Sequence, residues 1–232
     1  MITAVIVSVD EPQLERCLES VHNQTTPFSN IVHVNNVIPE AMATNSGIAQ
    51  VKDKWFMKVD GDFFLYPNAV ETVLENMVED KNIVSYGFPL YDGFLKHPLY
   101  GAGVTQTEIM RKYRLPNMLS NDFWHGKKIR KMGFGRKKCP VVIGTHFENP
   151  SEFQVFKRFF VSGIKYDKKY SWGKLYWQHV KTKDPLYLLA MRATEFGIIK
   201  KHYPFSHNLN YDKEMFEEFN EYCNINRKLW EF

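Results

Sequence analysis

The chain has 232 residues, 44% of them hydrophobic and 24% charged, with a formal net charge of +4. This composition is typical of a globular protein with a sizeable core, and the mild charge permits anionic partners without requiring nucleic acid. Three scattered cysteines exclude a disulfide framework and a CxxC zinc site, and no apolar run approaches the ~20 residues that cross a bilayer. We therefore expect a cytoplasmic protein with reduced thiols, in which any membrane contact is peripheral.

Strands and helices alternate through residues 2–90. Apolar and β-branched runs predict the strands, and apolar residues spaced i, i+3, i+4 and i+7 predict the helices between them. The expected strands cover residues 2–9, 31–34, 54–59 and 83–90, and the expected helices begin at Pro12, cover 40–51 and begin at Pro67. This alternation favours an α/β fold with a mostly parallel central sheet flanked by helices. Its strand ends, at Asp10, Asn35 and Asp60, should meet along one side.

The remainder of the sequence is less regular. Glycines and prolines predict loops around a short strand or helix over residues 93–118, and a short strand is expected over 139–143. Helical patterns cover residues 121–132, 151–162, 184–199 and 211–230. Because no clear linker or repeat interrupts the chain, we expect one domain over residues 1–165, with a helical C-terminal extension over 166–232 packed on it.

Asp60-Gly61-Asp62 follows an apolar run and is the feature from which function can best be argued. Two carboxylates one residue apart, at the carboxyl end of a strand, suit a hard divalent cation that takes oxygen ligands and can also bind phosphate oxygens. An Asp-Gly pair also makes ordinary turns. The EF-hand alternative fails, because its loop requires Asp or Asn and then Gly where this chain has Phe64 and Leu65.

Three other polar groups allow both a structural and a chemical interpretation. Asn45, two residues before Gly47, can approach a nucleotide or sugar closely, or it caps a helix or turn. Asp122 begins a basic helix, where it can take a proton from a hydroxyl or interact with the helix dipole. His146 follows a short strand and can complete a metal site begun by two carboxylates, although a lone loop histidine usually has no such role.

Basic residues concentrate between residues 127 and 138, and aromatic residues alternate with lysines between 165 and 177. The basic run is a solvated helix face and loop, or it attracts anions such as a diphosphate, a lipid-phosphate acceptor or an acidic membrane surface. The aromatic segment extends that surface, or it packs the C-terminal helices onto the domain. A nucleic-acid-binding function would need a recognisable reading module, and the sequence contains none.

In this order, the motifs resemble the family 2 glycosyltransferases with a GT-A fold, over residues 2–165. The resemblance rests on Leu14, Cys17-Leu18, Ser20 and Gln24; on Asn45, Gly47 and Ala49; on Asp60, Asp62, Pro67, Val70 and Glu71; and on Asp122, Arg130, Gly133, Pro140 and His146. The chain departs from the family at Asn35-Asn36, where an acidic pair is usual, and at Asn121, where a glutamate is usual. It has no Q-x-x-R-W motif, so a non-processive enzyme that adds one sugar is expected.

The resemblance implies a Rossmann-like GT-A fold, with residues 1–165 as the catalytic domain that binds the nucleotide sugar and the acceptor. It implies that Mn²⁺ or Mg²⁺ is held by Asp62, with Asp60 and either His146 or His207 as further ligands. The residues implied to contact the nucleotide sugar are Ser8, Asp10, Asn35, Asn45 and Asp60.

The implied reaction moves one sugar, with inversion, from a UDP-sugar to a hydroxyl of a glycan or glycolipid, as in polysaccharide or glycolipid biosynthesis. Asp122 would be the catalytic base that deprotonates this hydroxyl, and the cation would neutralise the charge on the leaving diphosphate. The alternative is a non-catalytic nucleotide- or carbohydrate-binding protein on the same scaffold. The sequence leaves open the sugar, the acceptor and the oligomeric state.

Overall fold

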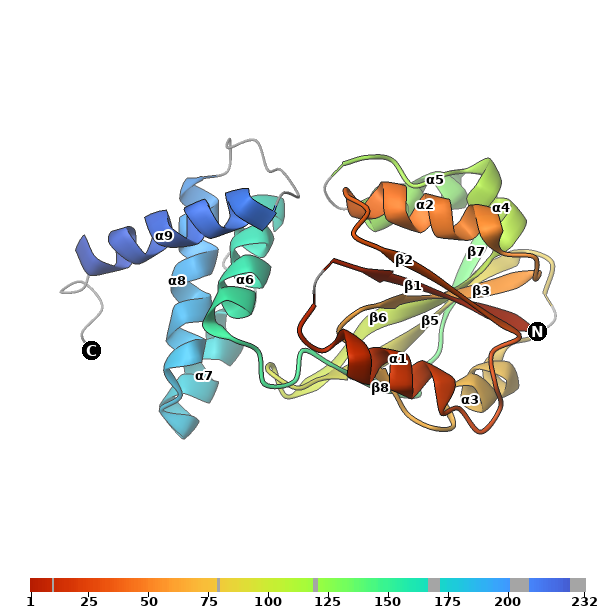
Figure 1. Ribbon diagram of the computed structural model, residues 1–232, viewed down its shortest axis with the longest axis horizontal. Helices are drawn as coiled ribbons and strands as arrows, with labels where there is room; N and C mark the ends of the chain where they lie inside the picture. Colours follow the sequence, from red (N-terminus) through yellow and green to blue (C-terminus); the bar gives the residue numbers. More distant parts are fainter. Residues whose placement is uncertain (10, 79, 119–120, 167–171, 201–208, 226–232) are drawn as a thin grey trace. The chain divides into compact units, whose positions relative to one another are not determined.

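The computed structural model describes residues 1–232 except 10, 79, 119–120, 167–171, 201–208 and 226–232 (Figure 1). The chain divides into two compact units, Met1–Glu148 and Asn149–Phe232. The sequence predicts a boundary after residue 165 instead. The difference is helix α6 (Glu152–Tyr166), which packs closely against α8 (Pro185–Ile199) and therefore groups with the C-terminal helices.

The first unit is built on a mixed sheet. In the described part of the chain the sheet has eight strands, and seven of them follow the order β2-β1-β3-β6-β5-β8-β4, while β7 pairs with β5. The strands are β1 (Ile2–Ser8), β2 (Asn30–Asn35), β3 (Trp55–Asp60), β4 (Phe63–Leu65), β5 (Ile83–Asp92), β6 (His97–Gln106), β7 (Gly135–Lys138) and β8 (Gly144–His146).

Strand directions determine which residues meet at each end of the sheet. Strand β1 is parallel to β2 and β3, so Ser8, Asn35 and Asp60 all lie at the carboxyl ends of these strands. Strand β6 is antiparallel to both β3 and β5, which makes β5 run in the same direction as β3. Strands β7 and β8 are parallel to β5. The carboxyl ends of β1, β2, β3 and β5 therefore face the same way.

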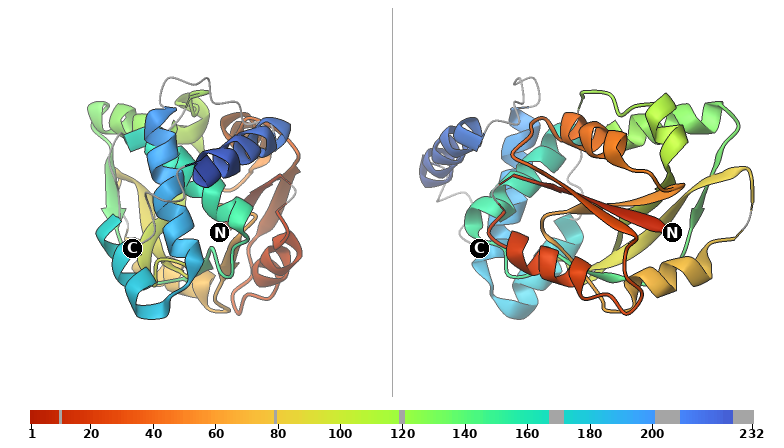
Figure 2. Two further views of the ribbon diagram at one scale, coloured as in Figure 1. Left: turned by 90° about the vertical axis from the view of Figure 1, so that its left-hand side faces the viewer. Right: turned by 45° about the vertical axis from the view of Figure 1, so that its right-hand side comes forward.

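Helices cover both faces of the sheet because β1 is apolar on both faces (Figures 1 and 2). Alternate residues of a strand point to opposite faces. Ile2, Ala4 and Ile6 join one core cluster, and Val5 and Val7 join another. The first cluster includes residues of α1 (Leu14–His22) and α3 (Ala69–Asn76), and the second includes residues of α2 (Glu40–Gln50) and α4 (Thr107–Lys112).

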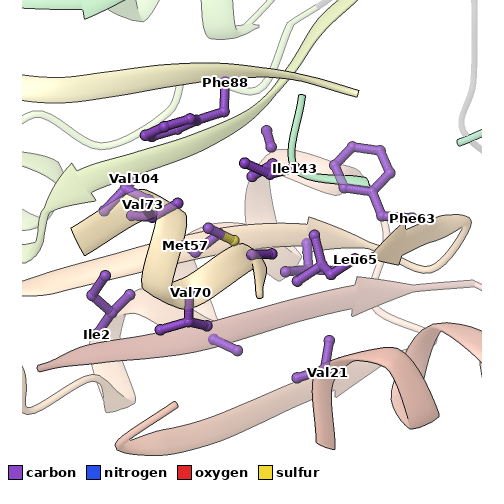
Figure 3. Packing of buried hydrophobic residues seen from close by; sticks show 14 of the residues in the cluster. Ile2, Val21, Met57, Phe63, Leu65, Val70, Val73, Phe88, Val104 and Ile143 are labelled. Carbon is purple, nitrogen blue, oxygen red and sulfur yellow. The ribbon is translucent and has the colours of Figure 1, made fainter. Parts of the chain in front are cut away.

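The first core cluster brings together side chains from distant parts of the chain. Figure 3 shows Val21 of α1, Val70 and Val73 of α3, Met57 of β3 and Phe88 of β5 in this cluster. All five are at most 2% exposed. Burial of such side chains stabilises the fold by roughly 1.5–3 kcal/mol each, before conformational entropy is counted.

The middle of the first unit differs from the sequence prediction in two places. Residues 93–118, expected as loops around a short element, contain the long strand β6 and helix α4. The turn between β5 and β6 is held by Asp92, whose Oδ1 accepts hydrogen bonds from Phe94 N and Leu95 N at 3.0 and 2.6 Å. The short strand expected over 139–143 is also wrong, because β7 ends at Lys138 and β8 begins at Gly144.

The second unit is helical in its described part, with α6, α7 (Trp172–Thr182), α8 and α9 (Leu209–Ile225). Its core is aromatic: Phe156 stacks on Phe160 with ring centroids 5.2 Å apart, and Phe196 and Phe219 contact these rings. Helices α6 and α8 cross so closely that a Cβ on Gly197 would lie 2.2 Å from the carbonyl oxygen of Phe160. Among the described residues, no helix is both long enough and apolar enough to cross a membrane.

Candidate active site

Asp60 ends β3 in contact with a lysine of the same strand. Lys58 Nζ lies 2.6 Å from Asp60 Oδ1 and 2.7 Å from Glu40 Oε1, so it joins the strand end to the first turn of α2. Burial alone would lower the pKa of Lys58, but the two carboxylates outweigh this effect and raise it. Lys58 is therefore charged, and it ties Asp60 to Glu40.

Carboxylates crowd around Asp60 despite this lysine. Desolvation raises the pKa of Asp60; Lys58 opposes the rise, while Glu40 and Asp122 add to it. Asp122 lies in the first turn of α5 (Asn121–Lys131) and is exposed. The charge of the expected catalytic base, some sixty residues downstream, therefore contributes to the raised pKa of Asp60.

Gly61 allows a further carboxylate to approach the acidic pair. Its N–H donates to Val7 O at 3.1 Å, and a Cβ on Gly61 would lie 2.8 Å from Glu11 Oε2. Glu11 in turn accepts a hydrogen bond from Val9 N at 2.6 Å. The loop after β1 thus places Glu11 beside Asp60-Gly61-Asp62, a neighbour that the sequence motifs do not reveal.

The same carboxylates affect the pKa of the buried thiol of Cys17. Burial raises the pKa of Cys17 to about 12, and the charges of Asp62, Asp60 and Glu11 contribute to the rise. Its Sγ also donates to the carbonyl oxygen of Asp60 at 3.4 Å. Cys17 therefore remains a neutral thiol that packs α1 beneath the acidic pair, and the expectation of a reduced thiol is consistent with its burial.

A small hydrogen-bond network lies where β1 and β2 end. Ser8 Oγ donates to Asn35 Oδ1 at 2.9 Å and lies 2.8 Å from His33 Nε2. Ser8 is buried and Asn35 is exposed. The structure thus brings together two of the residues expected near the nucleoside and adds His33 to them, whereas Asp10 lies outside the described residues.

Asn45 occupies a different environment. Its Nδ2 donates to Leu115 O at 3.0 Å, and its Oδ1 accepts from Leu115 N at 3.1 Å. Gly47, two residues further along α2, lets the helix lie close to β1, because a Cβ there would lie 2.5 Å from Val5 Cγ1. The Asn45 amide therefore ties α2 to the segment after α4, and its contact with a nucleotide sugar stays a prediction.

His146 lies on β8 and pairs with Phe63 of β4. Phe63 is the residue that follows Asp62 in the chain. Its Nδ1 is 3.6 Å from Oδ2 of Asp92, which is fully buried, and its ring packs edge-to-face against Phe63. Metal-ligating histidines usually direct one ring nitrogen at a carboxylate and the other at the metal, so Asp92 is a partner of the kind expected for a ligand. His207 lies outside the described residues.

The donor set at this end of the sheet fits a hard cation. Within the described ranges, no group of three or more His, Cys, Asp or Glu side chains is arranged to hold a metal on its own. Mg²⁺ and similar ions are commonly held by one or two carboxylates together with substrate phosphates, so a protein cage is not required. The crowded carboxylates of Asp60, Asp62 and Glu11 supply suitable oxygen atoms.

No model of a known protein family matches the sequence, and no curated protein matches it. Solved structures do resemble the fold. A mannosyltransferase, PcManGT from Pyrobaculum calidifontis, in complex with GDP-Man and Mn²⁺, has a TM-score of 0.57 at 10% identity, covering 96% of this chain and 80% of that chain. The fold is a GT-A fold.

Two further solved structures support this assignment. Glucosyl-3-phosphoglycerate synthase from Mycobacterium tuberculosis, in complex with Mn²⁺, UDP and phosphoglyceric acid, has a TM-score of 0.51 at 11% identity, covering 65% of this chain and 72% of that chain. TarS 1–349 from S. aureus, in complex with UDP, has a TM-score of 0.51 at 11% identity, covering 71% of this chain and 65% of that chain. The predicted fold class is confirmed.

The motifs did not reveal every residue around the acidic end of this GT-A fold. Lys58 carried a signal, since it is a charged residue inside an otherwise apolar strand, and such a residue needs a partner when the strand is buried. Asp92 could also have been noticed from the sequence, because it follows the strand expected over residues 83–90 by two residues and precedes Gly93. Glu11 and Glu40 had no signal, because their positions follow only from how loops and helices pack.

Proposed function

We propose that the protein is a glycosyltransferase that moves one sugar from a nucleotide sugar to an acceptor hydroxyl. One observation carries the proposal: on a GT-A fold, Asp60 ends β3 beside the carboxyl ends of β1 and β2, and the charge of Asp122 contributes to the raised pKa of Asp60. This is the side of an open α/β sheet on which ligands bind.

The acidic pair is proposed to bind Mn²⁺ or Mg²⁺, with Asp62 as the principal ligand. The resemblance to family 2 glycosyltransferases favours Asp62 for this role, and Asp60, which pairs with Lys58 at 2.6 Å, is proposed to face the ribose or sugar. His146, whose Nδ1 lies 3.6 Å from Asp92 Oδ2, is proposed as a further ligand. Such a cation supplies Lewis-acid stabilisation of the charge on a departing diphosphate.

Asp122 is proposed to act as the general base. Its exposed carboxylate at the start of α5 can accept a proton from an acceptor hydroxyl. The deprotonated oxygen then attacks the anomeric carbon from the side opposite to the leaving diphosphate. A single displacement of this kind inverts the configuration at that carbon.

Ser8 and Asn35 are proposed to contact the nucleoside of a UDP-sugar. Their mutual hydrogen bond holds the Asn35 amide at the strand end, and its Nδ2 donors suit the carbonyl groups of a pyrimidine base. The neighbouring His33 limits the space at this position. These contacts do not identify the sugar. The acceptor is proposed only by its class, a hydroxyl of a glycan or glycolipid.

The test is a panel of nucleotide sugars, supplied with Mn²⁺ and without an acceptor. We expect slow release of nucleoside diphosphate from one donor, most rapidly from a UDP-sugar, because water can replace the acceptor. Chelation of the metal should suppress release. Donor binding without any release, with Asp122 intact, would favour a non-catalytic binding protein, and failure to bind any donor would contradict both functions.

A further inference from the structure

The end of α5 brings three cations of the basic run together. Gly133 has a φ of +84°, which glycine adopts without strain. Gly133 N donates to Arg130 O at 3.0 Å and Phe134 N donates to Ile129 O at 3.3 Å, the pair of bonds that defines a Schellman turn. The chain therefore reverses directly into β7, and the last turn of α5 faces the side chains of that strand.

This reversal forms an open pocket of about 770 Å³. Arg130, Arg136 and Lys138 line it, together with Asn82 and the turn 133–135. No carboxylate is among the lining residues, and within the described residues none of the three cations forms an ion pair. The nearby carboxylate of Asp80 accepts a hydrogen bond from Asn82 N at 2.8 Å and does not line the pocket.

Packing supports the positions of two of these cations. A Cβ on Gly87 would lie 3.0 Å from Arg136 Nη2, so the glycine of β5 makes room for the guanidinium. Lys138 Nζ lies 4.8 Å from the centroid of the Tyr100 ring. A cation–π contact of this kind holds an ammonium without neutralising it. Both side chains are thus placed by uncharged neighbours.

The turn that closes the pocket lies at the start of β5, and Lys138 pairs with Gly87 in the middle of that strand, so the pocket is displaced from the carboxylates that end β3 and β5. Gly135 pairs with Ile83 at the start of β5, whereas Asp60 and Asp92 end their strands. Helix α5 carries Asp122 in its first turn and Arg130 in its last, about 12 Å apart at about 1.5 Å per residue. Arg130 is therefore about two helical turns away from the expected catalytic base.

Two structural effects can each account for the presence of individual cations among the three that line the pocket. Cations in the last turn of a helix interact favourably with its dipole, which accounts for Arg130. Charged side chains on an edge strand oppose edge-to-edge pairing, which accounts for Arg136 and Lys138. Neither effect requires the three groups to converge on one pocket, where they repel each other unless an anion lies between them.

We propose that this pocket is a second anion site, specific for phosphate groups and separate from the glycosyl-transfer site. Two guanidinium groups suit the oxygen atoms of a phosphate, with which they can form paired hydrogen bonds. The phosphate belongs to a headgroup in an anionic bilayer or to a soluble phosphorylated compound. Met132, which is 54% exposed beside the pocket, supplies an apolar side chain that can enter a bilayer surface.

The experiment measures binding of two probes in the presence of EDTA, which keeps metal-bound phosphate out of the acidic end. One probe is inorganic pyrophosphate, followed by calorimetry. The other is vesicles of phosphatidylcholine with or without phosphatidylglycerol, followed by co-sedimentation. The variant Arg130→Glu/Arg136→Glu/Lys138→Glu is compared with a matched control, Lys52→Glu/Arg114→Glu/Lys213→Glu, which changes the net charge equally at exposed positions outside the pocket.

We expect the pocket variant to bind at least one probe roughly tenfold or more weakly than the matched control. Loss of pyrophosphate binding alone identifies a soluble phosphate, and loss of binding to the phosphatidylglycerol vesicles identifies a headgroup. Equal binding by the two charge-reversal variants, or no binding of either probe by the native protein, overturns the proposal. The neutral variant Arg130→Gln/Arg136→Gln/Lys138→Gln gives the same comparison should the glutamates impair folding.

Discussion

Two aspartates lie at the two ends of β3, and their carboxylates have different kinds of partner. Asp53 precedes the strand and accepts hydrogen bonds from the hydroxyls of Thr3, at 2.6 Å, and Ser29. These hydroxyls lower the pKa of Asp53. Asp60 ends the strand among charges, and its pKa is raised. A carboxylate surrounded by neutral donors is stabilised without any opposite charge, whereas the crowded carboxylates near Lys58 are the proposed binding site of a further cation.

The largest expected effect tests whether the crowded end is catalytic. Asp122→Asn removes the proposed base while keeping the size of the side chain. Transfer to the acceptor should fall by roughly 10²–10⁴-fold, the usual contribution of a general base, while the donor KM changes little. Steady-state kinetics with the donor identified in the panel measures both quantities. Unchanged turnover would remove Asp122 from the mechanism.

The second effect concerns the proposed cation. Mn²⁺ should raise the melting temperature of the protein, because a ligand that binds only the folded state adds stability, about 2.7 kcal/mol at a hundred times its Kd. Asp62→Asn should abolish most of this increase. Asp53→Asn is the matched control at the other end of β3 and should retain it. Equal responses of the two variants would separate Asp62 from the metal.

The third effect tests Lys58 as the bridge between carboxylates. Lys58→Met leaves Asp60 and Glu40 facing each other without a cation, which should lower the free energy of unfolding by about 1–3 kcal/mol. Chemical denaturation measures this change. Lys54→Met, which alters an exposed lysine just before the strand, should cost less than about 0.5 kcal/mol. A similar small cost for both would show that the Lys58 bridge contributes little.

The fourth effect concerns Asn45, whose side-chain amide has hydrogen-bond partners in the backbone of Leu115. Asn45→Ala removes both hydrogen bonds to Leu115, at a cost of about 1–2 kcal/mol in the free energy of unfolding. Because the amide is occupied by the backbone, we expect the donor KM to stay within about twofold of the native value. A much larger rise in KM would instead support the nucleotide contact that the sequence predicts.

The smallest effect concerns pH and Asp53. Its folded-state pKa lies below the unfolded value of about 3.9, so its contribution to stability is present above that value and is lost as the pH falls through the folded-state pKa. Asp53→Asn should therefore be less stable than the native protein at pH 7, with the difference shrinking on acidification. Urea denaturation between roughly pH 7 and 2 measures it. A constant difference would contradict this contribution.

The sequence predicted the parts of the fold that depend on local pattern. Alternating strands and helices through residue 90, and the acidic pair at the end of β3, follow from periodicity and strand direction. Strand β6 was missed because Gly101 and Gly103 resemble loop residues. In the structure Gly103 pairs with Gly87, an antiparallel contact that no local pattern records.

The site was predictable only where its residues carry recognisable motifs. Asp60, Asp62 and Asp122 stood out by type and spacing, and the charge of Asp122 contributes to the raised pKa of Asp60. Lys58 contacts Glu40 across eighteen residues of sequence, and this contact exists only once α2 packs on the sheet. Asn45 shows a structural role that its motif does not reveal, since its amide bonds the backbone of Leu115, while its contact with a nucleotide sugar stays a prediction.

The crossing of α6 and α8 has a consequence for recognising other chains of this kind. A Cβ on Gly163 would lie 2.2 Å from Thr194 O, and one on Gly197 would lie equally close to Phe160 O. Backbone oxygen atoms cannot move aside as side chains do, so neither position accepts any side chain without separating the helices. A chain that shares this helical unit should therefore carry glycine at both positions, 34 residues apart, even where little else of its sequence is alike.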